Sequence, residues 1–152
     1  MVWNLTKRTF EIQKKQDGAL KKKRLIFVKI FMTIYGICFI FGGLRHWLDI
    51  MHAGILPYTG IPPFFNFYLT SLAILDFMVV IMLLLRPIHG LIFAVIIMAS
   101  DLLIDFHLSK TYWHTSLFEN IGLQLLAMFG IFLFFTAPFI IKCIIREQQQ
   151  NQ

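Results

Sequence analysis

The fold is decided by residues 64–106, which read FFNFYLTSLAILDFMVVIMLLLRPIHGLIFAVIIMASDLLIDF. Two apolar runs, Phe64–Leu85 and Ile88–Phe106, are separated only by Arg86 and Pro87. Each run is near the ~20 residues that a helix needs to cross a bilayer. Such runs must be helical, because lipid offers no water to the backbone. Since proline fits the first turn of a helix, the stretch predicts a tight antiparallel hairpin of two transmembrane helices.

Two further apolar runs flank this hairpin, Leu25–Leu44 before it and Ile121–Ile141 after it. The chain has 152 residues, of which 58% are hydrophobic and 14% are charged, whereas soluble domains average ~25% charged residues. So few charged side chains do not cover a soluble protein of this size. Strand-like alternation is absent, which argues against a membrane barrel. We therefore predict an all-α, four-helix transmembrane bundle over residues 25–141, and not a soluble enzyme, a disordered chain or a nucleic-acid-binding domain.

Basic residues collect on one side of the predicted bundle. Eleven lie before the first span or at the inner ends of the others: Lys7, Arg8, Lys14, Lys15, Lys21, Lys22, Lys23, Arg24, Arg86, Lys142 and Arg146. The opposite loops hold only Arg45 and Lys110. Because cytoplasmic loops of membrane proteins carry the excess of lysine and arginine, both termini are expected in the cytoplasm.

Residues 1–24 form a basic segment before the first span. On a helical wheel, Val2, Trp3, Leu5, Phe10 and Ile12 share one half, and Lys7, Arg8, Lys14 and Lys15 share the other. This pattern is typical of an amphipathic helix on an anionic leaflet, with Trp3, Lys7, Arg8, Lys14 and Lys15 at the membrane surface. The alternative is a basic tail that only sets topology. No cleavage site follows the first run, so we expect a permanent span. Residues 142–152 are expected to form a polar cytoplasmic tail.

Three carboxylates lie within the predicted hairpin. Asp76 is near the middle of its span, whereas Asp101 and Asp105 lie four residues apart in the outer part of the next span. A carboxylate at the centre of a bilayer costs ~2.5–3.5 kcal/mol, so deep ones are expected to be functional or strongly paired. Counting ~1.5 Å per residue from the turn, we predict that Asp76 and Asp101 face each other or a shared cavity and share a proton. Asp105 could instead be an interfacial carboxylate paired with Arg45 or Lys110.

Other polar side chains gather in the outer half of the bundle. Further candidates for contacts to a ligand or proton are Asn66, Tyr68, Gln124, Arg45 and His46. Their gathering in one half indicates a cavity that opens towards the outer face. The alternative is that they bridge helices, at ~0.6 kcal/mol for each interaction. We favour this alternative for Asn66 and Gln124, and also for Thr70 and Asn120.

Outer histidines are weak candidates for metal ligands. They are His46, His52 and His107, with Asp49 between the first two. Residues three apart drift about 60° around a helix, which is poorer than the four-residue spacing of helical zinc sites. We therefore predict no metal site, and the sequence names no cofactor. Two cysteines without a CxxC motif exclude a disulfide framework and a zinc ribbon.

Three short segments of the hairpin carry a resemblance. They are SLAILD at residues 71–76, LLLRPIHGL at 83–91 and IMASD at 97–101. They resemble small four-helix proteins of the bacterial inner membrane, and the layout is more distantly similar to the DoxX-like group. Asp76 departs from that group, which has glutamate there. The resemblance implies the bundle and an inner-membrane location, and it carries no activity.

Three functions follow as hypotheses from these features. The first is binding or carrying a small molecule, lipid or quinone in the outer cavity. The second is a non-catalytic accessory subunit, whose carboxylates pair with a membrane-protein partner or a second copy. The third is a metal-assisted membrane enzyme, which the absence of a compact catalytic constellation argues against. Active transport would favour repeats and broken helices, and neither is evident in the sequence.

Overall fold

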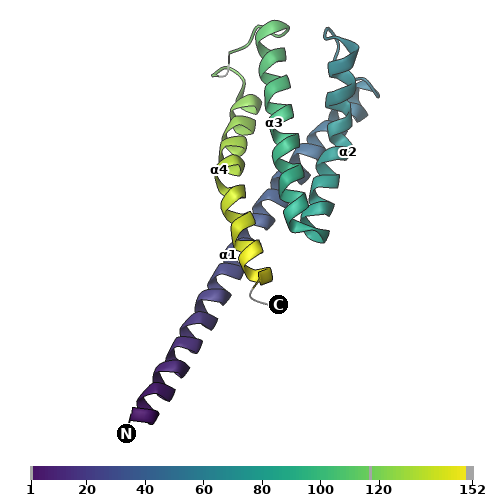
Figure 1. Ribbon diagram of the computed structural model, residues 1–152. Coiled ribbons are helices and arrows are strands. Elements are labelled where there is room, and N and C mark those ends of the chain that lie inside the picture. Colours follow the sequence, from purple (N-terminus) through teal and green to yellow (C-terminus); the bar gives the residue numbers. More distant parts are fainter. Residues whose placement is uncertain (1, 117, 150–152) are drawn as a thin grey trace.

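The structure is a computed structural model that describes residues 2–116 and 118–149. The described chain forms four helices, α1 (Val2–Ala53), α2 (Pro63–Leu85), α3 (Pro87–Thr111) and α4 (Ile121–Gln149) (Figure 1). Each is long and apolar enough to cross a membrane. The predicted all-α, four-helix architecture is confirmed, and the chain is a polytopic membrane protein.

The helices pack as a ring in chain order. Helix α2 contacts α1 and α3, and α4 contacts α3 and α1. In Figure 1, α2 and α3 stand side by side as a hairpin, α4 flanks α3, and α1 crosses them obliquely. Large apolar side chains on the outer faces are exposed, including Leu84, Leu103 and Phe135. These faces suit lipid, whereas Leu72 and Leu133 are fully buried in the core between the helices.

The predicted hairpin is confirmed, with Arg86 alone between α2 and α3. The Arg86 N–H donates to the carbonyl of Met82 at 2.8 Å, and Pro87 then begins α3. The helices touch one turn later, at Gly90. A Cβ there would lie 2.5 Å from the backbone nitrogen of Leu83 and 2.6 Å from the carbonyl carbon of Met82. Glycine is therefore required for this close approach.

Helix α1 contains the basic amino-terminal segment as well as the first span. It has 52 residues and extends far beyond the other helices (Figure 1). The predicted helix over residues 2–15 is thus found as the start of α1, along the axis of the span. The side chains of Trp3, Lys7, Arg8 and Lys14 lie outside the described residues, whereas Lys15 is exposed. The contact with the membrane surface stays a prediction.

Three helices run past the predicted ends of their apolar segments. Helix α1 continues to Ala53, where Gly54 (φ +90°) stops it in the left-handed conformation, with its N–H on the Ile50 carbonyl at 2.8 Å. Helix α3 continues to Thr111, and α4 to Gln149, into the expected tail. Hydropathy predicts only the part of a helix that lies in lipid. Outside lipid, polar residues can extend the same helix, because its backbone hydrogen bonds continue there. Helix α4 also runs through Pro138 without ending.

Candidate ligand cavity

A cavity of about 760 Å³ lies in the half of the bundle away from the basic ends, which the charge pattern predicts to be the outer half, and it is lined by all four helices and the α1–α2 loop. Much of its wall is apolar and aromatic, including Phe39, Leu69, Met98, Phe129 and Phe132. This volume falls within the range of ~300–1,000 Å³ that is typical of small-molecule sites.

The three hairpin carboxylates all line this cavity. Asp76 is 6% exposed and Asp101 is 9% exposed, so neither side chain points into the surrounding lipid. The charge of Asp101 lies within electrostatic reach of Asp76 and Asp105. Asp76 and Asp101 thus line the same cavity, while their roles in binding a ligand and sharing a proton stay predictions.

These carboxylates lack the partners that a structural role would require. Asp101 Oδ1 is buried without a hydrogen bond. The ion pairs among the described residues involve Asp49 and Glu147, and none includes Asp76, Asp101 or Asp105. Leaving a buried polar atom unpaired costs ~1–3 kcal/mol. The cavity therefore presents acidic groups that no side chain of the described chain satisfies.

A pair of glycines on α1 makes room for Asp76. A Cβ on Gly42 would lie 2.7 Å from Asp76 Oδ2, and one on Gly43 would lie 3.0 Å from Phe77 Cε2. Helix α1 can therefore approach α2 at the level of this carboxylate. Sequence reasoning did not single out Gly42, although a glycine pair within a span is a signal of close helix packing.

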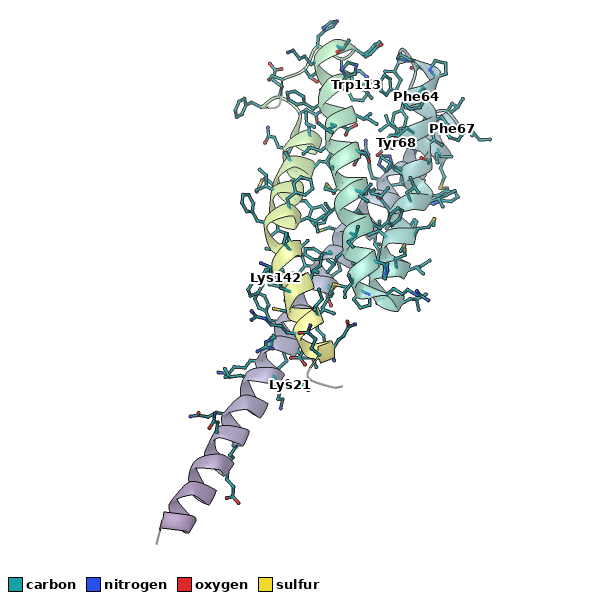
Figure 2. The ribbon with its side chains drawn as sticks, viewed as in Figure 1. Lys21, Phe64, Phe67, Tyr68, Trp113 and Lys142 are labelled. Atoms are coloured by element: carbon teal, nitrogen blue, oxygen red, sulfur yellow. The ribbon has the colours of Figure 1, made fainter. Side chains whose placement is uncertain are left out.

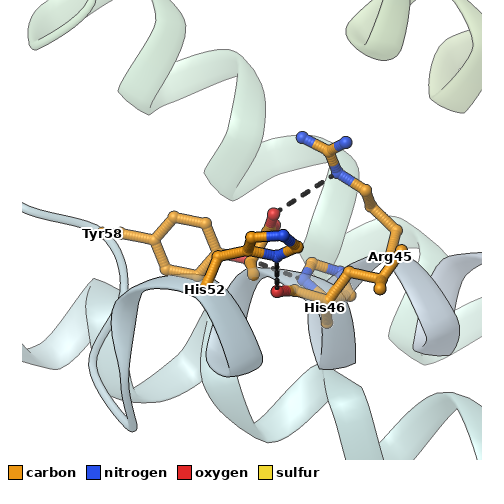
Figure 3. Close-up of polar contacts among 6 residues, drawn as sticks. Arg45, His46, His52 and Tyr58 are labelled. Atoms are coloured by element: carbon orange, nitrogen blue, oxygen red, sulfur yellow. Dashed lines mark hydrogen bonds and ion pairs between the residues drawn. The ribbon is translucent and has the colours of Figure 1, made fainter.

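A polar cluster lies at the rim of the cavity, around Tyr58 of the α1–α2 loop (Figure 3). The Tyr58 hydroxyl donates to Asp49 Oδ2 at 3.0 Å. It lies 2.9 Å from His46 Nδ1, which is therefore the donor of that second bond. Arg45 Nε forms an ion pair with Asp49 Oδ1 at 3.6 Å, so its partner is Asp49 rather than Asp105. Burial and the negative charge of Asp49 raise the pKa of Tyr58 well above its usual value, which keeps this hydroxyl a donor.

Asn66 holds the same loop from the side of α2. Its Nδ2 donates to the Tyr58 carbonyl at 2.8 Å, and its Oδ1 accepts the Tyr58 N–H at 3.3 Å. The loop is thus tied to both helices that it connects. Sequence reasoning placed Asn66 among helix-bridging residues but did not identify Tyr58, because a loop tyrosine has no periodic signal.

Five of the eight candidates for ligand or proton contacts line the cavity: Arg45, His46, Asp76, Asp101 and Asp105. The structure does not bring the other three to it. Asn66 holds the loop, Tyr68 bonds to Ser100 Oγ at 2.5 Å between α2 and α3, and Gln124 donates to the Phe118 carbonyl at 2.8 Å. Tyr68 thus joins two helices, whereas Asn66 and Gln124 contact the loop that precedes their own helix.

Two other residues of the bridging group also make local contacts. Thr70 donates to the carbonyl of Asn66 at 2.8 Å, one turn back on α2. Asn120 accepts the N–H of Leu123 at 3.1 Å and thereby caps the start of α4, although it also lines the cavity. The Thr70 hydroxyl and the Asn120 side-chain oxygen are thus engaged in local hydrogen bonds.

The weak metal candidates do not converge. His52 Nδ1 is 2.7 Å from the Leu48 carbonyl (Figure 3). The His107 ring lies against Phe65, with a centroid distance of 5.6 Å. Among residues 2–116 and 118–149, no group of three histidine, cysteine, aspartate or glutamate side chains could hold a metal ion.

The inner end of the bundle has a different kind of buried carboxylate. Glu147 of α4 is 8% exposed and lies 3.6 Å from Arg24 Nη1 and 3.9 Å from Lys21 Nζ, both on α1. Figure 2 shows Lys21 and Lys142 at the end of the bundle away from Trp113. Glu147 was missed because it falls in the expected polar tail, where hydropathy predicts neither burial nor a partner.

A second polar contact joins α1 and α4 deeper in the bundle. Tyr35, which is fully buried, lies 2.5 Å from Thr136 Oγ1 through its hydroxyl. Thr136 in turn donates to the Phe132 carbonyl. Below it, a hollow of about 740 Å³ lies among α1, α2 and the end of α4, with Lys29 in a mainly apolar lining.

No protein-family model, no curated protein and no solved structure matches the chain. The function must therefore be argued from the cavity and its carboxylates.

Proposed function

We propose that this membrane protein binds a small organic molecule, lipid or quinone in the outer cavity. The observation that carries the proposal is Asp101, a carboxylate 9% exposed that lines the cavity and has one buried oxygen without a hydrogen bond. A ligand with a polar group at this level would satisfy Asp101 and Asp76, while its apolar part would lie against the aromatic wall. The proposal concerns binding of the molecule and not its transport across the membrane.

The accessory-subunit hypothesis receives less support. A partner's basic residues could neutralise Asp76 and Asp101 only if these side chains lay on the outer surface of the bundle. Both are enclosed by the chain's own helices, so a partner helix would have to displace part of the ring to reach them. The metal-assisted enzyme receives no support from the positions of His46, Asp49, His52 and His107.

The proposed location is a bacterial inner membrane, with both termini on the cytoplasmic side. This orientation is supported by the eleven basic residues near the inner ends and by the positive-inside rule. A relation to the DoxX-like group belongs to the same proposal. A reporter fused after Gln152 that is active only in the cytoplasm should be active, and activity of a periplasmic reporter there would contradict the orientation.

Native mass spectrometry tests the binding proposal. Protein released from its own membranes should carry a small-molecule adduct that survives removal of detergent. Leu126→Trp, which fills the cavity from α4, should reduce this adduct at least tenfold. Phe135→Trp is the matched control, because Phe135 is 79% exposed on the same helix.

Two results would contradict the proposal. One is the absence of any adduct from the unsubstituted protein. The other is equal adduct occupancy in Leu126→Trp and Phe135→Trp, because a molecule bound elsewhere on the bundle would not sense the cavity.

A further inference from the structure

We propose that the outer cavity takes a lipophilic organic cation, whose positive charge lies between Asp76 and Asp101. This inference rests on the proposed function and names the chemical class of its ligand. It depends on the balance of charges around the cavity, on the aromatic wall and on the contrast with the second hollow.

The titratable side chains in the interior of the cavity are acidic. Asp76, Asp101 and Asp105 line it, and no ion pair among the described residues involves any of them. Arg45 is the basic side chain at the rim, where it pairs with Asp49 and is 76% exposed. A bound cation would favour the ionised form of these carboxylates, whereas a bound anion would disfavour it.

The rest of the lining suits the body of such a ligand. Phe39 and Phe129 meet edge to face at 5.5 Å, and Phe132 continues the same wall. Aromatic faces attract cations, most strongly where water is excluded. The cavity thus combines carboxylates for the charge with apolar surface for its substituents.

The second hollow provides an internal contrast. It is of nearly equal volume, about 740 Å³, and its lining is likewise mainly apolar. Its titratable lining residues are Lys29 and Glu147, and Glu147 is already paired with Arg24. The two cavities are therefore similar in volume and in their mainly apolar lining. Among the described lining residues, acidic side chains without an ion-pair partner lie only in the outer cavity.

Equilibrium dialysis with tetraphenylphosphonium tests the inference. The full chain is reconstituted in nanodiscs of zwitterionic phosphatidylcholine, so that lipid charge does not attract the probe. We expect saturable binding of this cation and at least tenfold weaker binding of tetraphenylborate, an anion of the same size and shape. Asp76→Asn and Asp101→Asn should each weaken cation binding at least tenfold.

Two variants serve as controls for these substitutions. Glu119→Gln removes a negative charge from the outer side at an exposed position outside the cavity, and binding should not change. Asp101→Glu keeps the carboxylate, and it should bind the cation within about threefold of the unsubstituted protein. Far-ultraviolet circular dichroism verifies that each variant retains its helices.

Cys38 offers a second readout inside the cavity. It lines the outer cavity, whereas Cys143 does not, so a Cys143→Ser background leaves one cysteine to alkylate. Tetraphenylphosphonium should slow the reaction of Cys38 with N-ethylmaleimide at least fivefold. Tetraphenylborate should not.

The outcomes separate this inference from the proposed function. If both tetraphenyl ions bind equally, or if cation binding is unchanged in Asp76→Asn and Asp101→Asn, the cation inference is wrong. A cavity-dependent native adduct would in that case leave the proposed function standing. If neither ion binds and no native adduct is found, both fail.

Discussion

The two ends of the bundle bury carboxylates in opposite ways. At the inner end, Glu147 joins α4 to α1 through ion pairs with Lys21 and Arg24. In the outer half, Asp76 and Asp101 are equally buried, yet they face a cavity and no cation of the described chain. Burial alone therefore does not separate a structural carboxylate from a candidate site. The presence of a partner does, because a paired charge is neutralised by the fold and an unpaired one is left for a ligand.

This contrast predicts different consequences of substitution. At the inner end Glu147 and Gly90 make direct contacts between helices, so changes there should alter the free energy of unfolding. In the outer half the helices enclose a hollow, so changes there should alter binding while leaving stability nearly the same. Five substitutions test the contrast, with unfolding measured in one detergent throughout.

The largest effect is expected from Gly90→Ala in the hairpin. The new Cβ would lie within 2.7 Å of three backbone atoms of Met82 and Leu83, and overpacking of this kind costs about 3 kcal/mol. Gly36→Ala is the control, because nothing lies within 4 Å of a Cβ there. Thermal unfolding should show a large loss for the first variant and no loss for the second. Equal stability of the two would mean that the hairpin is not close-packed.

A smaller loss is expected from Glu147→Gln. The change leaves Arg24 without its partner, and a fully buried pair broken this way would cost ~3–5 kcal/mol. Because the Arg24 side chain is 28% exposed and that of Lys21 is 42% exposed, we expect about 1–2 kcal/mol. Hydrogen exchange at the end of α4 should become faster as this stability is lost. Glu11→Gln, at an exposed position of α1, should leave both measurements unchanged.

Tyr58→Phe should act locally. It removes the hydrogen bonds of the hydroxyl to Asp49 and His46, and a net loss of about 1 kcal/mol corresponds to roughly fivefold faster opening of the loop. Hydrogen exchange over residues 54–62 should report this change while α4 stays the same. Tyr112→Phe is the matched control. Equal hydrogen-exchange protection of the loop in Tyr58→Phe and Tyr112→Phe would show that the hydrogen bonds of the rim cluster do not stabilise the loop.

The smallest change in stability is expected from Asp76→Asn and Asp101→Asn. Neither carboxylate has an ion-pair partner to lose among the described residues, and a neutral amide is cheaper to bury than a charge. We expect unfolding free energies within about 0.5 kcal/mol of the unsubstituted protein. A loss as large as that of Glu147→Gln would make these carboxylates structural, and the contrast between the two ends would fail.

Much of the candidate site followed from depth in the membrane. Asp76 and Asp101 were identified because a deep carboxylate is costly, and the short hairpin placed them on neighbouring helices. Tyr58, Gly42 and Glu147 were not identified. Their importance depends on which atoms lie opposite them, and hydropathy and spacing carry no information on that.

The sequence by itself determined the number of spans, their order and the hairpin between Leu85 and Pro87. The physical reason is that lipid imposes a nearly constant helix length, and so short a link permits only an antiparallel neighbour. Tertiary structure alone decided that five of the eight polar candidates face one cavity, that Arg45 pairs with Asp49, and that Glu147 is buried against α1. Those outcomes depend on the rotation and tilt of each helix, which packing contacts such as Gly43 against Phe77 set.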